Sequence, residues 1–150
     1  MAYKDADTWM ERGDQFLKTE VYDKALDCFT KAININPRLP FAYFKRGTCY
    51  YNLKQPNNAI ADFNNAITLN SSFSFAYFKR GSVYMDMRQY KAAIADFDAA
   101  VEENDKLVFA YYKRGYCKYI MKDFEEAIAD FNLTIELEPT YSNAYFYRGN

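Results

Sequence analysis

The chain has 150 residues, of which 50% are hydrophobic and 19% aromatic, and its formal net charge at pH 7 is -1. That much apolar material excludes an intrinsically disordered chain, and the balanced charge argues against an electrostatic nucleic-acid binder. Histidine is absent, which removes the commonest general base and a frequent zinc ligand. We therefore expect no enzyme activity, no metal and no cofactor.

The five glycines lie 34 residues apart and divide the chain into repeats: Gly13, Gly47, Gly81, Gly115 and Gly149. A fixed period of this kind indicates tandem units that pack on their neighbours. We therefore expect a single array over residues 1–150. Its repeats cover residues 6–39, 40–73, 74–107 and 108–141, and a partial fifth repeat covers residues 142–150.

Within each repeat, apolar residues recur at spacings of three and four on both sides of a short break, which predicts two helices. Repeat one should hold helices near residues 7–19 and 22–35, and Pro37 ends the second. In chain order, the other helix pairs are expected near 41–53 and 56–69, 75–87 and 90–103, and 109–121 and 124–137. Residues 142–150 match a first helix without a second.

A glycine inside a helix costs about 1 kcal/mol relative to alanine, so each repeat must gain something at this position. Other small and large residues keep the same period: Ala25, Ala59, Ala93, Ala127, Phe29, Phe63, Phe97 and Phe131. We therefore expect the second helix of each repeat to approach the glycine of the first helix closely.

Repeat one carries the pattern Trp9, Gly13, Phe16, Ala25, Phe29, Ala32 and Pro37, and close variants recur in the next three repeats. This pattern resembles the tetratricopeptide repeat. The resemblance implies an all-α fold, a right-handed superhelical α-solenoid of helix-turn-helix repeats. It also implies a scaffold or adaptor that binds other proteins.

In that family the first helices line a concave groove. The resemblance places these side chains in it: Phe41, Phe44, Lys45, Tyr51, Phe75, Phe78, Lys79, Phe109, Tyr112, Lys113, Tyr116 and Tyr119. The alternative is that these aromatic residues only pack between helices. Other aromatic residues already fill the contact between the two helices of each repeat, so this additional set favours a binding surface. The three lysines favour an acidic protein or peptide partner.

An arginine precedes every glycine, and aspartates recur in the second helices. We expect ion pairs that join each repeat to the next: Asp62 with Arg80, Asp96 with Arg114, and Asp130 with Arg148. Cys28 stands at the aspartate position of repeat one, so Arg46 should lack a carboxylate. The alternative is an arginine row that binds phosphate or carboxylate ligands.

Two other functions stay open, namely self-assembly through the open fifth-repeat helix and a targeting arm of a larger enzyme. The family's standard clamp for chaperone C-termini is matched here only at Lys79 or Lys113, so we expect no such clamp. No apolar run is long enough to span a bilayer. With Cys28, Cys49 and Cys117 as core thiols, we expect a cytoplasmic protein with no membrane or nucleic-acid partner.

Overall fold

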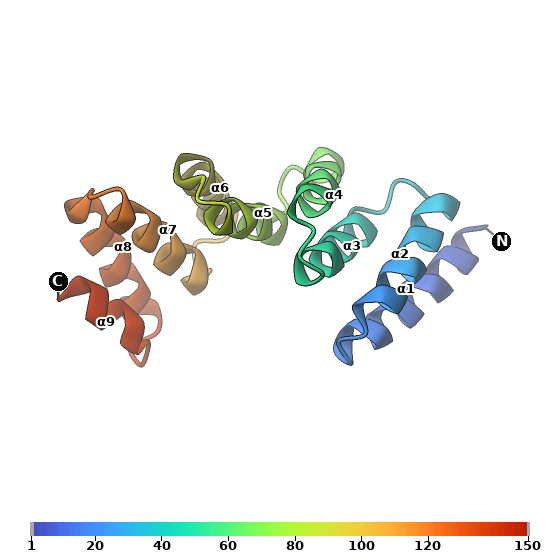
Figure 1. The fold of residues 1–150 in the computed structure, drawn as a ribbon, viewed down its shortest axis with the longest axis horizontal. Coiled ribbons are helices and arrows are strands. Elements are labelled where there is room, and N and C mark those ends of the chain that lie inside the picture. Colours follow the sequence, from blue (N-terminus) through green and yellow to red (C-terminus); the bar gives the residue numbers. More distant parts are fainter. Residues whose placement is uncertain (1, 150) are drawn as a thin grey trace. The chain divides into compact units, whose positions relative to one another are not determined.

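The computed structural model describes residues 2–149, and side chains from residue 5 onward. This part of the chain contains helices and no strand (Figure 1). The helices are α1 (Ala2–Lys18), α2 (Tyr22–Ile35), α3 (Pro40–Asn52), α4 (Pro56–Leu69), α5 (Ser74–Asp86), α6 (Tyr90–Glu103), α7 (Val108–Ile120), α8 (Phe124–Leu137) and α9 (Ser142–Arg148). The second helices match their predicted ranges, whereas α3, α5 and α7 lie one residue earlier than predicted.

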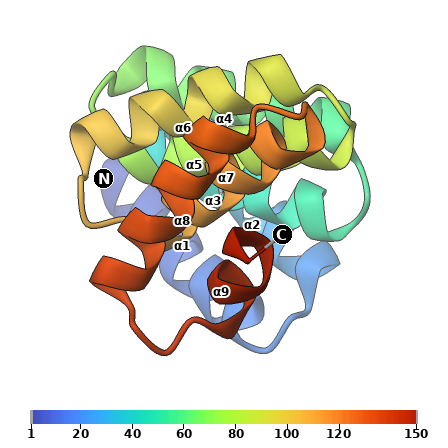
Figure 2. The same cartoon turned by 90° about the vertical axis from the view of Figure 1, so that its left-hand side faces the viewer.

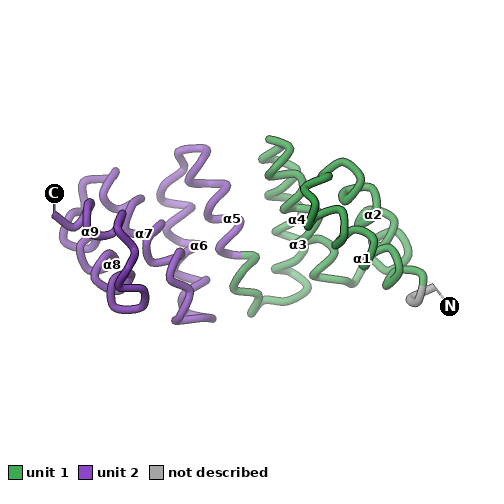
Figure 3. The backbone as a smooth tube through the Cα atoms, turned by 90° about the horizontal axis from the view of Figure 1, so that it is seen from below, with its two compact units in different colours: residues 1–76 green, residues 77–150 purple. Residues whose placement is uncertain are grey.

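The chain forms two compact bodies, an N-terminal body of residues 1–76 and a C-terminal body of residues 77–150 (Figure 3). In the N-terminal body, α1 packs on α2, α2 on α3, and α3 on α4. In the C-terminal body, α6 packs on α7, α7 on α8, and α8 on α9 (Figure 1 and Figure 2). Helices thus pack on their neighbours in sequence, as in an α-solenoid of tandem repeats.

The glycines allow the second helix of a repeat to approach the first, as the sequence predicted. A Cβ atom on Gly115 would lie 2.9 Å from Cε1 of Phe131 and 3.0 Å from the Cβ atom of Asp130. The first four glycines meet a phenylalanine of the second helix in this way, at 2.5–2.9 Å. At Gly149 the nearest such atom is the carbonyl oxygen of Tyr145 at 3.5 Å, an ordinary contact.

The helices α1, α3, α5 and α7 each end in a Schellman motif, although no glycine stands at the turn. The residues in the left-handed conformation are Glu20, Lys54, Arg88 and Lys122, with φ between 60° and 66°. The next residue donates its backbone N–H five residues back, as from Gln55 to the Tyr50 carbonyl at 2.9 Å. This turn sets the reversal between the two helices of a repeat.

Asparagines shape the connections after three of the second helices. The Oδ1 atoms of Asn36, Asn70 and Asn104 accept the backbone N–H two residues later at 3.1–3.2 Å. Such Asx turns stop a helix without proline. They explain why the connections after α4 and α6 need no equivalent of Pro37.

Alanines, phenylalanines and thiols fill the interior of each body. Phe29, Phe63, Phe97 and Phe131 are completely buried. The three cysteines are free and buried, which confirms the prediction of core thiols, and burial raises the pKa of Cys49 and of Cys117 to about 12. Among the described residues, no helix is long and apolar enough to cross a membrane, and no cluster of three potential metal ligands occurs.

Candidate functional site

The arginines and aspartates form ion pairs, but the predicted partners were wrong. Each arginine binds the aspartate of its own repeat through two nitrogens at 2.6–2.9 Å: Arg46 with Asp62, Arg80 with Asp96, and Arg114 with Asp130. The reason is that the second helix folds back on the first of its own repeat, so the aspartate beside the glycine faces the arginine before that glycine. Hydrogen bonding to these aspartates raises the pKa of Arg46 and Arg80.

The corrected pairing also reassigns the arginines at the two ends of the row. Arg46 does have a carboxylate, so the arginine left without one by Cys28 is Arg12. Arg148, which was expected to bind Asp130, donates to Oδ1 of Asn132 at 3.3 Å.

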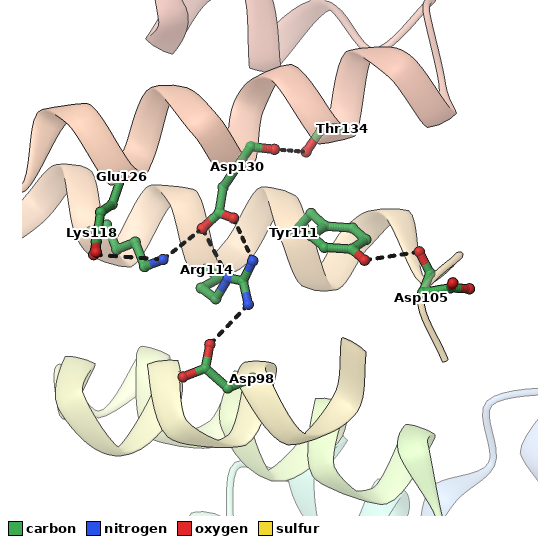
Figure 4. Close-up of polar contacts among 8 residues, drawn as sticks. All are labelled: Asp98, Asp105, Tyr111, Arg114, Lys118, Glu126, Asp130 and Thr134. Carbon is green, nitrogen blue, oxygen red and sulfur yellow. Dashed lines mark hydrogen bonds and ion pairs between the residues drawn. The ribbon is translucent and has the colours of Figure 1, made fainter. Parts of the chain in front are cut away.

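The Nη1 atom of Arg114, which does not bind Asp130, contacts the preceding repeat. Figure 4 shows Arg114 between Asp98 of α6, at 2.9 Å from Nη1, and Asp130 of α8. Lys118 adds a second cation, with its Nζ atom 3.2 Å from Asp130. Arg46, Arg80 and Arg114 therefore have internal carboxylates, which argues against their use as ligand-binding groups.

The predicted aromatic groove residues fall into two sets. The phenylalanines of the first set are 49–57% exposed: Phe41, Phe75 and Phe109. The rings of the second set are partly buried, each 5.9 Å from the buried phenylalanine of its repeat: Phe44, Phe78 and Tyr112. The packing interpretation therefore fits the second set, while the first set leaves its rings accessible.

The tyrosines predicted for repeat four meet around Tyr147 of α9. Its ring centroid lies 6.4 Å from that of Tyr112, 5.5 Å from Tyr116 and 5.2 Å from Tyr119. Burial raises the pKa of Tyr112 to about 12. These rings form a packed wall, and Tyr51 of repeat two is also only partly exposed.

The three groove lysines differ in how their charge is balanced. Lys45 lies 2.7 Å from the carboxylate of Asp14. Lys113, at the same register, meets a hydroxyl instead, because its Nζ atom donates to Oγ of Ser82 at 3.0 Å and lies 5.0 Å above the ring of Phe78. Lys79 makes no hydrogen bond or ion pair with any side chain of residues 5–149.

Burial lowers the pKa of both Lys79 and Lys113. For Lys113 the negative charge of Asp86 acts against the effect of burial, and the positive charge of Lys79 adds to it. Two neighbouring, partly buried ammonium groups of the C-terminal body thus lack the direct carboxylate partner that Lys45 has.

A pocket of about 400 Å³ opens beside Lys113, with Met85, Tyr112 and Tyr116 among its walls. We call Phe78, Lys79, Ser82, Met85, Phe109, Tyr112, Lys113 and Tyr116 the basic aromatic surface. All but Ser82 and Met85 are predicted site residues. Those two lie at groove registers, but neither carries a charge or an aromatic ring that singles it out in the sequence.

Comparisons with known proteins agree on the kind of repeat. Profiles described as "Tetratricopeptide repeat" match residues 6–39, 40–73, 76–106 and 108–141. Human RNA polymerase II-associated protein 3 is 36% identical over 45 residues, which are 30% of this chain and 7% of that protein. The chain therefore corresponds to a small part of the curated relative that it matches.

Solved structures that are similar over most of the chain include the MamA protein and a TPR domain of Spaghetti (RPAP3). The MamA protein gives a TM-score of 0.90 at 26% identity, over 97% of this chain and 80% of that chain. The first TPR of Spaghetti (RPAP3), bound to the HSP90 peptide SRMEEVD, gives 0.78 at 27% identity. That match covers 80% of this chain and 95% of the other.

Proposed function

Because the chain belongs to the tetratricopeptide repeat family, we propose that it is a protein-interaction module whose basic aromatic surface binds an acidic peptide segment. The observation that carries the proposal is the pair of partly buried lysines, Lys79 and Lys113, without a bound carboxylate. Proteins of this family act as binding scaffolds rather than enzymes, so the function should lie in such a surface.

Electrostatics favours an acidic ligand. Burial penalises a charged ammonium group, which is why the pKa of Lys79 and of Lys113 is lowered. A ligand carboxylate placed between them would offset that penalty and form charge-assisted hydrogen bonds. Lys45 should contribute less, because Asp14 already balances its charge at 2.7 Å.

The aromatic part of the surface supplies apolar contact beside the charges. Phe109 is 53% exposed, and Tyr116 lines the pocket next to Lys113. Rings of this kind carry much of the binding energy in interfaces because they bury a large area at a small loss of conformational freedom. The expected ligand is therefore an extended segment with acidic residues next to an apolar one.

The solved RPAP3 domain is bound to a peptide with two glutamates and one aspartate, an acidic ligand on a related scaffold. For this chain we propose an acidic peptide as the ligand but not the C-terminus of a chaperone, because the sequence matches only one position of the family's standard chaperone clamp.

An array of acidic ten-residue peptides, each with one aromatic or aliphatic residue, tests the proposal. Neutral copies with Gln and Asn in place of Glu and Asp are the control. The chain should prefer the acidic copies, and Lys79→Met with Lys113→Met should abolish that preference while circular dichroism stays unchanged. Lys45→Met is the matched control and should retain it. Equal binding of acidic and neutral copies would refute the proposal.

Self-association through α9 is a second candidate. Phe146 is 64% exposed and Tyr145 41% exposed. An apolar face of this kind favours association with another molecule. Sedimentation equilibrium of the chain and of Phe146→Ser tests this candidate. Self-association predicts an oligomer that Phe146→Ser weakens, and a monomer at the highest usable concentration contradicts it.

A further inference from the structure

Repeat one lacks the internal carboxylate that the next three repeats possess. In those repeats the arginine before the glycine donates two hydrogen bonds to an aspartate 16 residues later. The equivalent residues of repeat one are Arg12 and Cys28. The thiol cannot accept this fork, and Arg12 makes no hydrogen bond or ion pair with any side chain of residues 5–149.

The neighbouring aspartate does not take over. The next three repeats read Ala-Ile-Ala-Asp-Phe here, whereas repeat one reads Ala-Leu-Asp-Cys-Phe over residues 25–29. A shift by one residue turns a side chain about 100° around the helix. Asp27 is accordingly exposed and pairs with Lys31 at 3.4 Å. No carboxylate of residues 5–149 therefore pairs with Arg12.

A pocket of about 800 Å³ lies at this place, between α1 and α2. Its walls include Trp9, Arg12, Phe16, Lys24 and Cys28. Both cations rest on aromatic rings, Arg12 at 5.2 Å from the centroid of Trp9 and Lys24 at 5.7 Å from that of Phe16. Two cations held on aromatic rings beside a buried thiol make a receptor for an anionic group next to an apolar one.

We propose that this pocket binds a single carboxylate, presented beside an apolar group by an acidic side chain of a partner peptide. Arg12 supplies the two-pronged contact that its counterparts give to an internal aspartate, and Trp9 and Phe16 contact the apolar group. Asp23 and Asp27 also line the pocket, so polyanions are disfavoured. The pocket shares no residue with the basic aromatic surface. Its ligand is a single carboxylate beside an apolar group, whereas the basic aromatic surface is proposed to bind a segment with several acidic residues.

Trp9 is the only tryptophan of the chain, so its fluorescence reports directly on this pocket. The probe is the peptide acetyl-Ala-Ile-Ala-Asp-Phe-amide, which repeats the residues that carry the internal carboxylate. Titrated into the full chain, it should change the emission saturably. The copy with Asn in place of Asp should bind at least about tenfold more weakly, because it loses charge-assisted hydrogen bonds.

Variants of Cys28, which lines the pocket, test the proposal directly. Cys28→Asp restores the internal carboxylate and should keep the helical circular dichroism while weakening the peptide at least about tenfold. Cys28→Ser is the matched control, and it should bind like the unmodified chain. Lys79→Met should also leave this binding unchanged, which separates the result from that of the proposed groove function. Equal binding by Cys28→Asp, or no saturable signal at all, would overturn the proposal.

Discussion

The same substitution, glycine to alanine, should have opposite effects at two positions of one register. At Gly115 the added Cβ atom would lie 2.9 Å from Cε1 of Phe131 and 3.0 Å from Cβ of Asp130, where contacts below 3.4 Å are already tight. Phe131 is completely buried and cannot turn away. Helices α7 and α8 must therefore separate. At Gly149 the closest atom is 3.5 Å away, and nothing has to move.

The magnitude follows from two opposing contributions. Overpacking costs about 1–3 kcal/mol, and the better helix propensity of alanine offsets about 1 kcal/mol of that. Gly115→Ala should therefore destabilise the chain by up to about 2 kcal/mol, which corresponds to a fall in the thermal midpoint of up to roughly 8 °C. Gly149→Ala should leave the midpoint unchanged or raise it, because only the propensity term remains.

Thermal and urea unfolding, followed by circular dichroism at 222 nm, measure both variants. The double variant Gly115→Ala with Phe131→Leu is the control, because the smaller side chain makes room for the Cβ atom. Its loss of stability should be smaller than the sum of the two single losses. If Gly115→Ala stabilises the chain as much as Gly149→Ala does, close helix packing is not the reason for the glycines.

Three further predictions concern charge and thiols. Asp62→Ala leaves the guanidinium of Arg46 without its buried partner and should lower the free energy of unfolding in urea by about 3–5 kcal/mol. Loss of the exposed Asp98 should lower it by less than about 1 kcal/mol. Similar losses would contradict the argument that burial of the carboxylate sets the size of the effect. Because burial lowers the pKa of Lys79 below its ordinary value of 10.5, the folded chain releases this proton at lower pH than the unfolded chain. The charge is therefore destabilising at neutral pH, so Lys79→Met should raise the thermal midpoint, by an amount that shrinks as the pH rises toward 10.5; a gain independent of pH would exclude desolvation as its cause. With pKa values of about 12, Cys49 and Cys117 should react with a thiol reagent at pH 8 only after urea unfolds the chain, and fast reaction of the native chain would show that these thiols are accessible.

Periodicity identified the helices but could not identify the ion-pair partners. Asp62 is 16 residues after Arg46 and 18 residues before Arg80, and both spacings recur in repeats three and four. A periodic sequence therefore fits either pairing equally well. The choice is made by the way in which the second helix folds back on the first, which places Asp62 at 2.7 Å from Arg46.

Exposure of the aromatic side chains was equally ambiguous. Phe41 and Phe44 are three residues apart on the same helix, and a hydrophobicity pattern treats them alike. In the structure Phe44 covers the buried Phe63 at 5.9 Å, whereas Phe41 is 57% exposed. Both rings contact Phe73, at 5.0 Å for Phe41 and 4.9 Å for Phe44. The difference is that Phe44 also contacts the buried Phe63, and these neighbours lie far away in sequence.

Sequence alone determined the repeat length, the helix ranges to within a residue at most ends, and the need for glycine at one register. These features follow from local preferences and from a strict 34-residue period. Tertiary structure alone decided which carboxylate each arginine binds, which lysines lack one, and where a pocket opens at Cys28. Such properties depend on distances between side chains of different helices, and a period fixes the register of a residue but not its neighbour.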